Sequence, residues 1–141
     1  MYGYEKFDRI SYLMGFIECF CEMVHAKVKR LALSPILTPE EAKILLPAVK
    51  ELCKYFDIEY TEEPQLLRNL LVDDSKLDGK IVYLLYDDPQ LMPEYNALKK
   101  RESEAKANGT YTDAVRAELN DGLCRLLSYP EGGETQLYKD K

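Results

Sequence analysis

The chain has 141 residues, of which 46% are hydrophobic and 31% charged, a composition typical of one globular domain and not of a disordered protein. Its formal net charge of -6 argues against general nucleic-acid binding, which depends on lysine and arginine side chains that neutralise phosphates. No apolar run reaches the length of a membrane-spanning helix. We therefore expect neither nucleic acid nor a membrane among its partners.

The first predicted element is a long helix over residues 4–33, and the rest of the chain is expected to pack around it. Its apolar residues recur at alternating steps of three and four, which keeps them on one helix face. A helix of about 30 residues spans about 45 Å, whereas a compact domain of this size is near 37 Å across. The helix should then overhang, bend at Gly15 or pair with a second copy. Its apolar residues are Phe7, Ile10, Met14, Ile17, Cys21, Val24, Val28 and Leu31.

The opposite face of this helix is a narrow polar strip, where any chemistry of the helix would lie. Glu18, Glu22 and His25 follow one another at helical spacing on that strip. Their arrangement resembles one half of the carboxylate and histidine set in ferritin-like di-iron bundles, and it predicts a metal site at these three residues. The chain has one histidine, so a symmetrical two-metal site would need a second copy.

The four cysteines lie inside apolar helical patterns, and no signal peptide precedes them. We interpret Cys19, Cys21, Cys53 and Cys124 as buried, reduced thiols of a cytoplasmic protein. Cys21 and His25, four residues apart, could also begin a zinc site that Cys53 or Cys124 completes. Cys21 belongs to the apolar stripe and His25 to the polar strip, which makes shared coordination awkward.

His25 supports a second alternative. A histidine on a long helix of an acidic bundle resembles the layout of histidine phosphotransfer domains. Those domains carry a lysine three residues after the histidine and a glycine after that, whereas this chain has Val28 and Lys29 at these positions. The departure removes the small residue that opens access to the imidazole.

The second helix has the clearest start signal in the chain. Pro35 ends the first helix, and Thr38 then precedes a proline and two glutamates, so that Thr38 is the N-cap and Glu41 reaches back to it. The helix is predicted to run to Asp57. Pro47 falls on its solvent-facing side, where a bend is expected and not a break.

A third helix is predicted over residues 62–72, followed by an acidic turn over residues 73–79. The next segment, residues 80–86, is ambiguous, because its valine, isoleucine and tyrosines favour a strand. A strand needs a partner, and the only candidates are the weak segments 58–60 and 136–138. We therefore predict a short buried helix over residues 80–86.

Two further helices complete the pattern. One is predicted to begin at Pro93 and to run to Ala107, closed by Asn108 and Gly109, and the other to begin at Thr112 and to end before Pro130. The polar residues 130–141 are expected to form a disordered tail.

Together these elements predict an all-α protein: a single helical domain over residues 1–129, built as a bundle of five to six helices around the long N-terminal helix. We find no nucleophile beside a base and no phosphate-binding glycine loop, so we expect neither an enzyme nor a cofactor. The predicted function is protein–protein association in the cytoplasm, as a homodimer or with a partner protein. The alternatives are metal binding at Glu18, Glu22 and His25, and phosphotransfer through His25.

Overall fold

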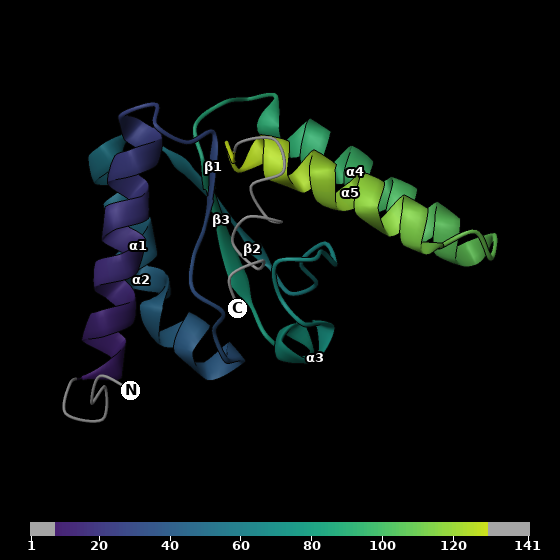
Figure 1. Cartoon of the computed structure of the whole chain (residues 1–141). Coiled ribbons are helices and arrows are strands. Elements are labelled where there is room, and N and C mark those ends of the chain that lie inside the picture. Colours follow the sequence, from purple (N-terminus) through teal and green to yellow (C-terminus); the bar gives the residue numbers. More distant parts are fainter. Residues whose placement is uncertain (1–7, 130–141) are drawn as a thin grey trace, which may run out of the picture.

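The computed structural model describes residues 8–129, which form five α-helices and three β-strands (Figure 1). In chain order these elements are α1 (Arg9–His25), β1 (Leu31–Leu33), α2 (Pro39–Phe56), β2 (Glu59–Glu63), α3 (Asp74–Leu77), β3 (Val82–Tyr86), α4 (Leu91–Ala107) and α5 (Asp113–Leu126).

The three strands form an antiparallel sheet in the order β1-β3-β2, with helices on both faces (Figure 1). Because β1 and β2 are both antiparallel to β3, they run parallel to each other, and α2 connects them. Ala32, Tyr83 and Leu85 pack against α1 and α2. Val82 and Leu84, on the alternate positions, pack towards α4 and α5. The sheet thus divides the core into two layers.

The prediction of an all-α bundle is therefore wrong, and the error comes from the helix predicted over residues 80–86. This segment contains the central strand β3, in which Val82, Tyr83, Leu84 and Leu85 are all buried. A strand covered on both faces shows no alternation of apolar and polar residues, so its pattern cannot be distinguished from that of a buried helix.

The predicted length of the N-terminal helix is also wrong, because α1 has 17 residues and ends at His25. Lys27 takes a left-handed conformation with φ of 65°, and the chain turns there into β1. The helical spacing of apolar residues extends in the sequence to Leu31, because Leu31 is a buried residue of β1 and is therefore apolar as well. A helix of this length spans about 25 Å, so it has no need to overhang or bend. Residues 4–7 of the predicted helix lie outside the described residues.

The helix predicted over residues 62–72 is absent from the structure. Glu62 and Glu63 belong to β2, and the residues that follow form a loop before the single turn of α3. Thr61, which would be the N-cap of such a helix, instead pairs with Leu84 in the sheet, and its hydroxyl is hydrogen-bonded to that of Tyr86 at 2.8 Å. Segment 58–60 does contribute to the sheet, whereas segment 136–138 lies outside the described residues.

The local start and stop signals are confirmed except at two points, the end of the first helix at Pro35 and the start of the fourth helix at Pro93. Thr38 and Glu41 form the reciprocal capping box of α2, which contains Pro47 and ends at Asp57 in a left-handed conformation. The fourth predicted helix begins two residues before Pro93, and Thr112 caps the last helix.

Both outer strands have an edge that no described strand covers. β2 presents Glu59 and Glu62 as exposed residues along its length. β1 has only three residues, and the following Pro35 has no backbone N–H to offer.

Ser34 joins β1 to β3 where the ladder is irregular. Its backbone N–H donates to the Tyr83 carbonyl at 2.9 Å, and the next pairing, Leu37 with Ile81, is three residues on in one segment and two in the other. The extra residue is a β-bulge. The Ser34 hydroxyl takes over the missing ladder bond by accepting from the Tyr83 N–H at 2.8 Å.

We expect Ser34→Ala to lower the free energy of unfolding by about 1–3 kcal/mol, because it leaves the buried Tyr83 N–H without an acceptor. Urea unfolding followed by circular dichroism measures this. Ser103→Ala, at an exposed position of α4, is the control and should be neutral. Equal effects of the two substitutions would contradict the role of the Ser34 hydroxyl.

Candidate functional site

The predicted metal ligands Glu18, Glu22 and His25 are all exposed on α1. His25 is the last residue of the helix, and its ring lies against that of Phe56 with the centroids 5.9 Å apart. Within residues 8–129, no three histidine, cysteine, aspartate or glutamate side chains are grouped so as to hold a metal ion. The three residues share a helix surface without converging on a point.

Three of the four cysteines are buried, as predicted, whereas Cys19 is exposed. Cys21 and Cys53 are hydrogen-bonded to each other between α1 and α2, and this bond together with burial raises the pKa of Cys21. Cys124 belongs to α5, on the other side of the sheet. The four residues of the proposed zinc site are therefore apart: Cys21 and Cys53 form a buried thiol pair, His25 is exposed, and Cys124 lies in the opposite layer.

The position of His25 also removes the layout on which the phosphotransfer alternative rested. In that layout the histidine lies within a long helix of a bundle. Here His25 ends its helix, and Val28 and Lys29 lie in the turn that follows. The Lys29 ammonium donates to the Leu127 carbonyl at 2.8 Å, so it serves to join that turn to the end of α5.

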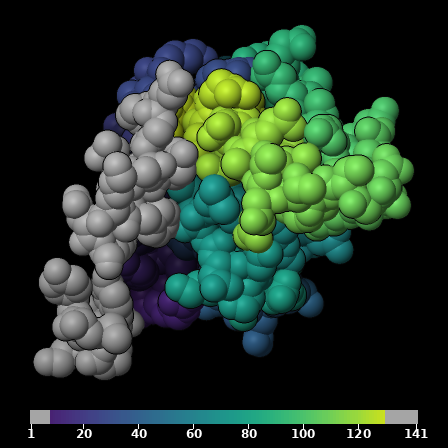
Figure 2. Space-filling model, turned by 45° about the vertical axis from the view of Figure 1, so that its right-hand side comes forward, coloured from purple at the N-terminus to yellow at the C-terminus, as the bar shows by residue number. Residues whose placement is uncertain are grey.

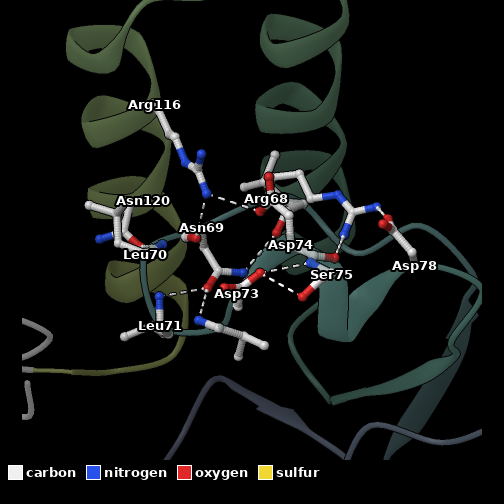
Figure 3. Close-up of polar contacts among 12 residues, drawn as sticks. Arg68, Asn69, Leu70, Leu71, Asp73, Asp74, Ser75, Asp78, Arg116 and Asn120 are labelled. Atoms are coloured by element: carbon white, nitrogen blue, oxygen red, sulfur yellow. Dashed lines mark hydrogen bonds and ion pairs between the residues drawn. The ribbon is translucent and has the colours of Figure 1, made fainter.

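The densest polar network of the described residues holds the loop between β2 and α3 against α4 and α5 (Figure 3). The Asn69 carboxamide is buried; its oxygen accepts from the N–H groups of Leu71 and Val72, and its nitrogen donates to the Leu67 carbonyl. Asn120 of α5 is also buried and accepts from the Leu70 N–H at 2.8 Å. The space-filling view shows this loop, in teal, lying against the yellow-green α5 (Figure 2).

Charged side chains also hold this loop in place. Arg116 of α5 donates to the Asp74 carboxylate at 2.9 Å, and Arg68 donates to the Asp74 carbonyl and to the Asp78 carboxylate (Figure 3). The Glu102 carboxylate of α4 accepts from the Arg68 N–H at 3.1 Å. These groups are engaged in fixing the backbone of the loop, so the network is structural.

Tyr95 connects this loop to the sheet. Its hydroxyl donates to the Glu63 carboxylate at 2.7 Å and accepts from the Leu67 N–H at 3.1 Å. Burial, followed by the bond to Glu63, raises the pKa of Tyr95. The hydroxyl therefore stays protonated and keeps donating to the carboxylate.

The outward surface of α1 and α2 has a different character, because exposed apolar side chains gather on it. Among the described residues, seven large hydrophobic side chains are exposed, and five of them lie on these two helices. Tyr55, at 81% exposure, is the most exposed of the seven. The seven are Tyr12, Met14, Phe16, Val28, Ile44, Tyr55 and Leu70.

A hollow of about 750 Å³ lies between α1 and α2 on this surface. We call the hollow and the exposed residues around it the outer face. The hollow is lined by Met14, Glu18, Ala48, Glu51, Leu52, Lys54 and Tyr55.

The outer face carries charges of both signs. α1 contributes the carboxylates of Glu18 and Glu22, and α2 contributes the carboxylate of Glu51 together with the ammonium groups of Lys43, Lys50 and Lys54. All six side chains are exposed, and none of them forms an ion pair with another described residue. The packing of α2 beside α1, which brings these lysines next to the acidic strip, is a tertiary property that no local pattern shows.

Comparison with protein-family models, with curated proteins and with solved structures found no match for this chain. None of the helices within residues 8–129 has the length and apolar character needed to cross a membrane. We therefore infer a function from the geometry of the outer face.

We expect opposite outcomes when the hydroxyls of two tyrosines near the loop are removed. Tyr95→Phe should cost about 1–3 kcal/mol of unfolding free energy, because it leaves the buried Leu67 N–H without an acceptor and removes the hydrogen bond that Tyr95 donates to Glu63. Tyr111 has a buried hydroxyl that bonds to no other described residue. Tyr111→Phe should therefore be neutral or stabilising. Thermal unfolding of the two variants tests this, and a loss for Tyr111→Phe as large as that for Tyr95→Phe would contradict it.

The metal hypothesis is tested by elemental analysis of the untagged protein after dialysis against zinc, iron and manganese. Since Glu18, Glu22 and His25 do not converge, we expect each metal well below one equivalent. His25→Ala should give the same content as the natural sequence. One equivalent of a metal that is lost in His25→Ala would instead establish the site.

Proposed function

We propose that the protein acts by protein–protein association, and that its outer face binds a second copy of the chain to form a homodimer. The observation that carries this proposal is that five of the seven exposed large apolar side chains of the described residues lie on α1 and α2, two of them, Met14 and Tyr55, in the lining of the hollow between these helices. Exposed apolar patches on otherwise polar surfaces usually mark binding sites. The length of the first helix no longer supports the proposal, because α1 is short enough to fit the domain.

The apolar side chains of the outer face are suited to supply affinity. Full burial of one large apolar side chain is worth about 1.5–3 kcal/mol, and in a two-fold contact each side chain counts twice. Tyr55 offers a rigid ring with little conformational entropy to lose. Met14 offers a flexible thioether that adapts to an irregular partner surface.

The charges favour a second copy over an unrelated partner. A two-fold interface uses the same surface on both subunits, so that surface must be complementary to itself. The outer face meets this requirement in charge, because it carries exposed carboxylates and exposed lysines side by side. A surface of one sign would have repelled its own copy.

We further propose that the dimer belongs to the cytoplasm. All four cysteines are free, and three of them are buried. Free thiols persist in a reducing compartment.

Light scattering coupled to size exclusion should give twice the mass of one chain at micromolar concentration. Tyr55→Glu and Met14→Glu should each shift the protein towards the monomer, because a buried, unpaired carboxylate is costly at an apolar contact. Leu70→Glu is the matched control: Leu70 is 49% exposed but belongs to the loop, so its variant should remain dimeric. A monomeric mass for the natural sequence would overturn the proposal.

A further inference from the structure

We infer that residues 1–7, which directly precede Asp8 and α1, fold back along this helix and occupy a groove between α1 and the end of β1. We call these seven residues the N-terminal segment. The groove is separate from the hollow between α1 and α2, so this inference does not depend on the proposed self-association. It gives the exposed aromatic rings of α1 a partner within the same chain.

The groove has a volume of about 380 Å³ and lies where β1 runs back alongside α1 (Figure 1). On its α1 side, Tyr12 and Phe16 meet edge to face with their ring centroids 4.9 Å apart, and Phe20 continues the row at 6.2 Å from Phe16. Tyr12 is still 37% exposed and Phe16 40% exposed. Both rings thus retain apolar surface that a further segment can cover. The opposite wall consists of Leu33, Pro35 and Ile36.

The groove and the hollow lie on opposite flanks of α1. Met14 lines the hollow, whereas Phe16 lines the groove, and no residue lines both. Side chains two residues apart on a helix point about 200° away from each other around its axis. A segment in the groove therefore leaves Met14 and Tyr55 of the outer face available to a second copy.

The start of α1 directs the N-terminal segment towards this groove. Asp8 is the N-cap: its backbone is extended and its carboxylate accepts from the Ile10 N–H at 3.2 Å. The residue before an N-cap often packs against the fourth residue of the helix, a hydrophobic staple that fixes the direction in which the chain enters the helix. In this chain those two residues are Phe7 and Tyr12, and both are aromatic. The staple places Phe7 on a ring that lines the groove.

The composition of the N-terminal segment suits an apolar groove that is open to water on one side. Four of its seven residues are apolar or aromatic: Met1, Tyr2, Tyr4 and Phe7. In an extended segment Tyr2 and Tyr4 point to one side and the charged Glu5 points to the other. Tyrosine fits such a groove because its ring can be buried while its hydroxyl stays in water.

The length of the segment also matches that of the groove. In an extended segment Tyr4 lies about 10 Å and Tyr2 about 16 Å from Phe7. Measured from the first residue of α1, Phe16 lies about 10 Å and Phe20 about 16 Å along the helix. With Phe7 over the first turn of α1, the rings of Tyr4 and Tyr2 therefore come level with those of Phe16 and Phe20.

A double-mutant cycle, measured by urea unfolding, tests the first contact. If the two rings pack on each other, the effects of Phe7→Ala and Tyr12→Ala overlap. The double variant should then change the unfolding equilibrium constant roughly two- to tenfold less than the product of the single effects. Phe7→Ala combined with Leu70→Ala is the matched control, because Leu70 belongs to the loop after β2, and these two effects should multiply. Effects of Phe7→Ala and Tyr12→Ala that multiply in the same way would overturn the inference.

Binding of the dye 1-anilinonaphthalene-8-sulfonate tests the rest of the segment. The full chain carrying Y2S/Y4S/F7S should raise the dye fluorescence roughly twofold or more, because the emptied groove exposes apolar surface. Adding Phe16→Ser to this variant should remove the increase. Thermal unfolding verifies that both variants remain folded.

The other outcomes of the dye experiment contradict the inference. Unchanged fluorescence in Y2S/Y4S/F7S would show that the N-terminal segment does not cover the groove. An increase that persists when Phe16→Ser is added would place the newly exposed surface elsewhere. Light scattering separates this inference from the proposed function, since Y2S/Y4S/F7S should have the same mass as the natural sequence. A natural sequence that is monomeric would overturn the dimer and leave this inference standing.

Discussion

The burial of β3 on both faces is the constraint on which the rest of the structure depends. A strand with helices on either side has no water to bond its backbone, so every N–H and C=O group must find a partner within the sheet. β1 and β2 provide these partners along its two edges. Where β1 departs from regular pairing, the Ser34 hydroxyl replaces the missing acceptor. The two helical layers then cover the strand, and the outer face is the solvent side of one layer.

The features that the sequence predicts well are local ones. The capping box at Thr38, the solvent-facing position of Pro47 and the left-handed Gly109 after α4 each depend on a few neighbouring residues. The sheet could not be predicted in this way. β3 carries no alternation because both of its faces are buried, and β1 continues the apolar period of α1 without interruption. The pairing of β1 with β3 joins Leu33 to Leu84, and that of β2 with β3 joins Glu59 to Tyr86, so no local pattern predicts either.

In the candidate site, too, the local features could be predicted and the tertiary ones could not. The acidic strip of α1 followed from helical spacing alone, and Glu18 and Glu22 are exposed as that spacing implies. Its proposed use changed, because the neighbouring helix brings lysines, apolar side chains and one carboxylate, Glu51, and no three possible ligands converge within residues 8–129. The buried amides of Asn69 and Asn120 were missed, since a single asparagine among leucines has no characteristic spacing. Their role depends on a loop whose path is set by α4 and α5.

The acidic edge of β2 has a consequence for how copies of this protein can assemble. An uncovered strand edge is a template for another strand, and long apolar edges lead to fibrous aggregates. Glu59 and Glu62 place negative charge along one edge, and the short β1, followed by Pro35, limits the other. Growth of the sheet from one molecule to the next is thereby disfavoured. The dimer that we propose uses the helical surface instead, where a two-fold contact closes on itself and stops at two subunits.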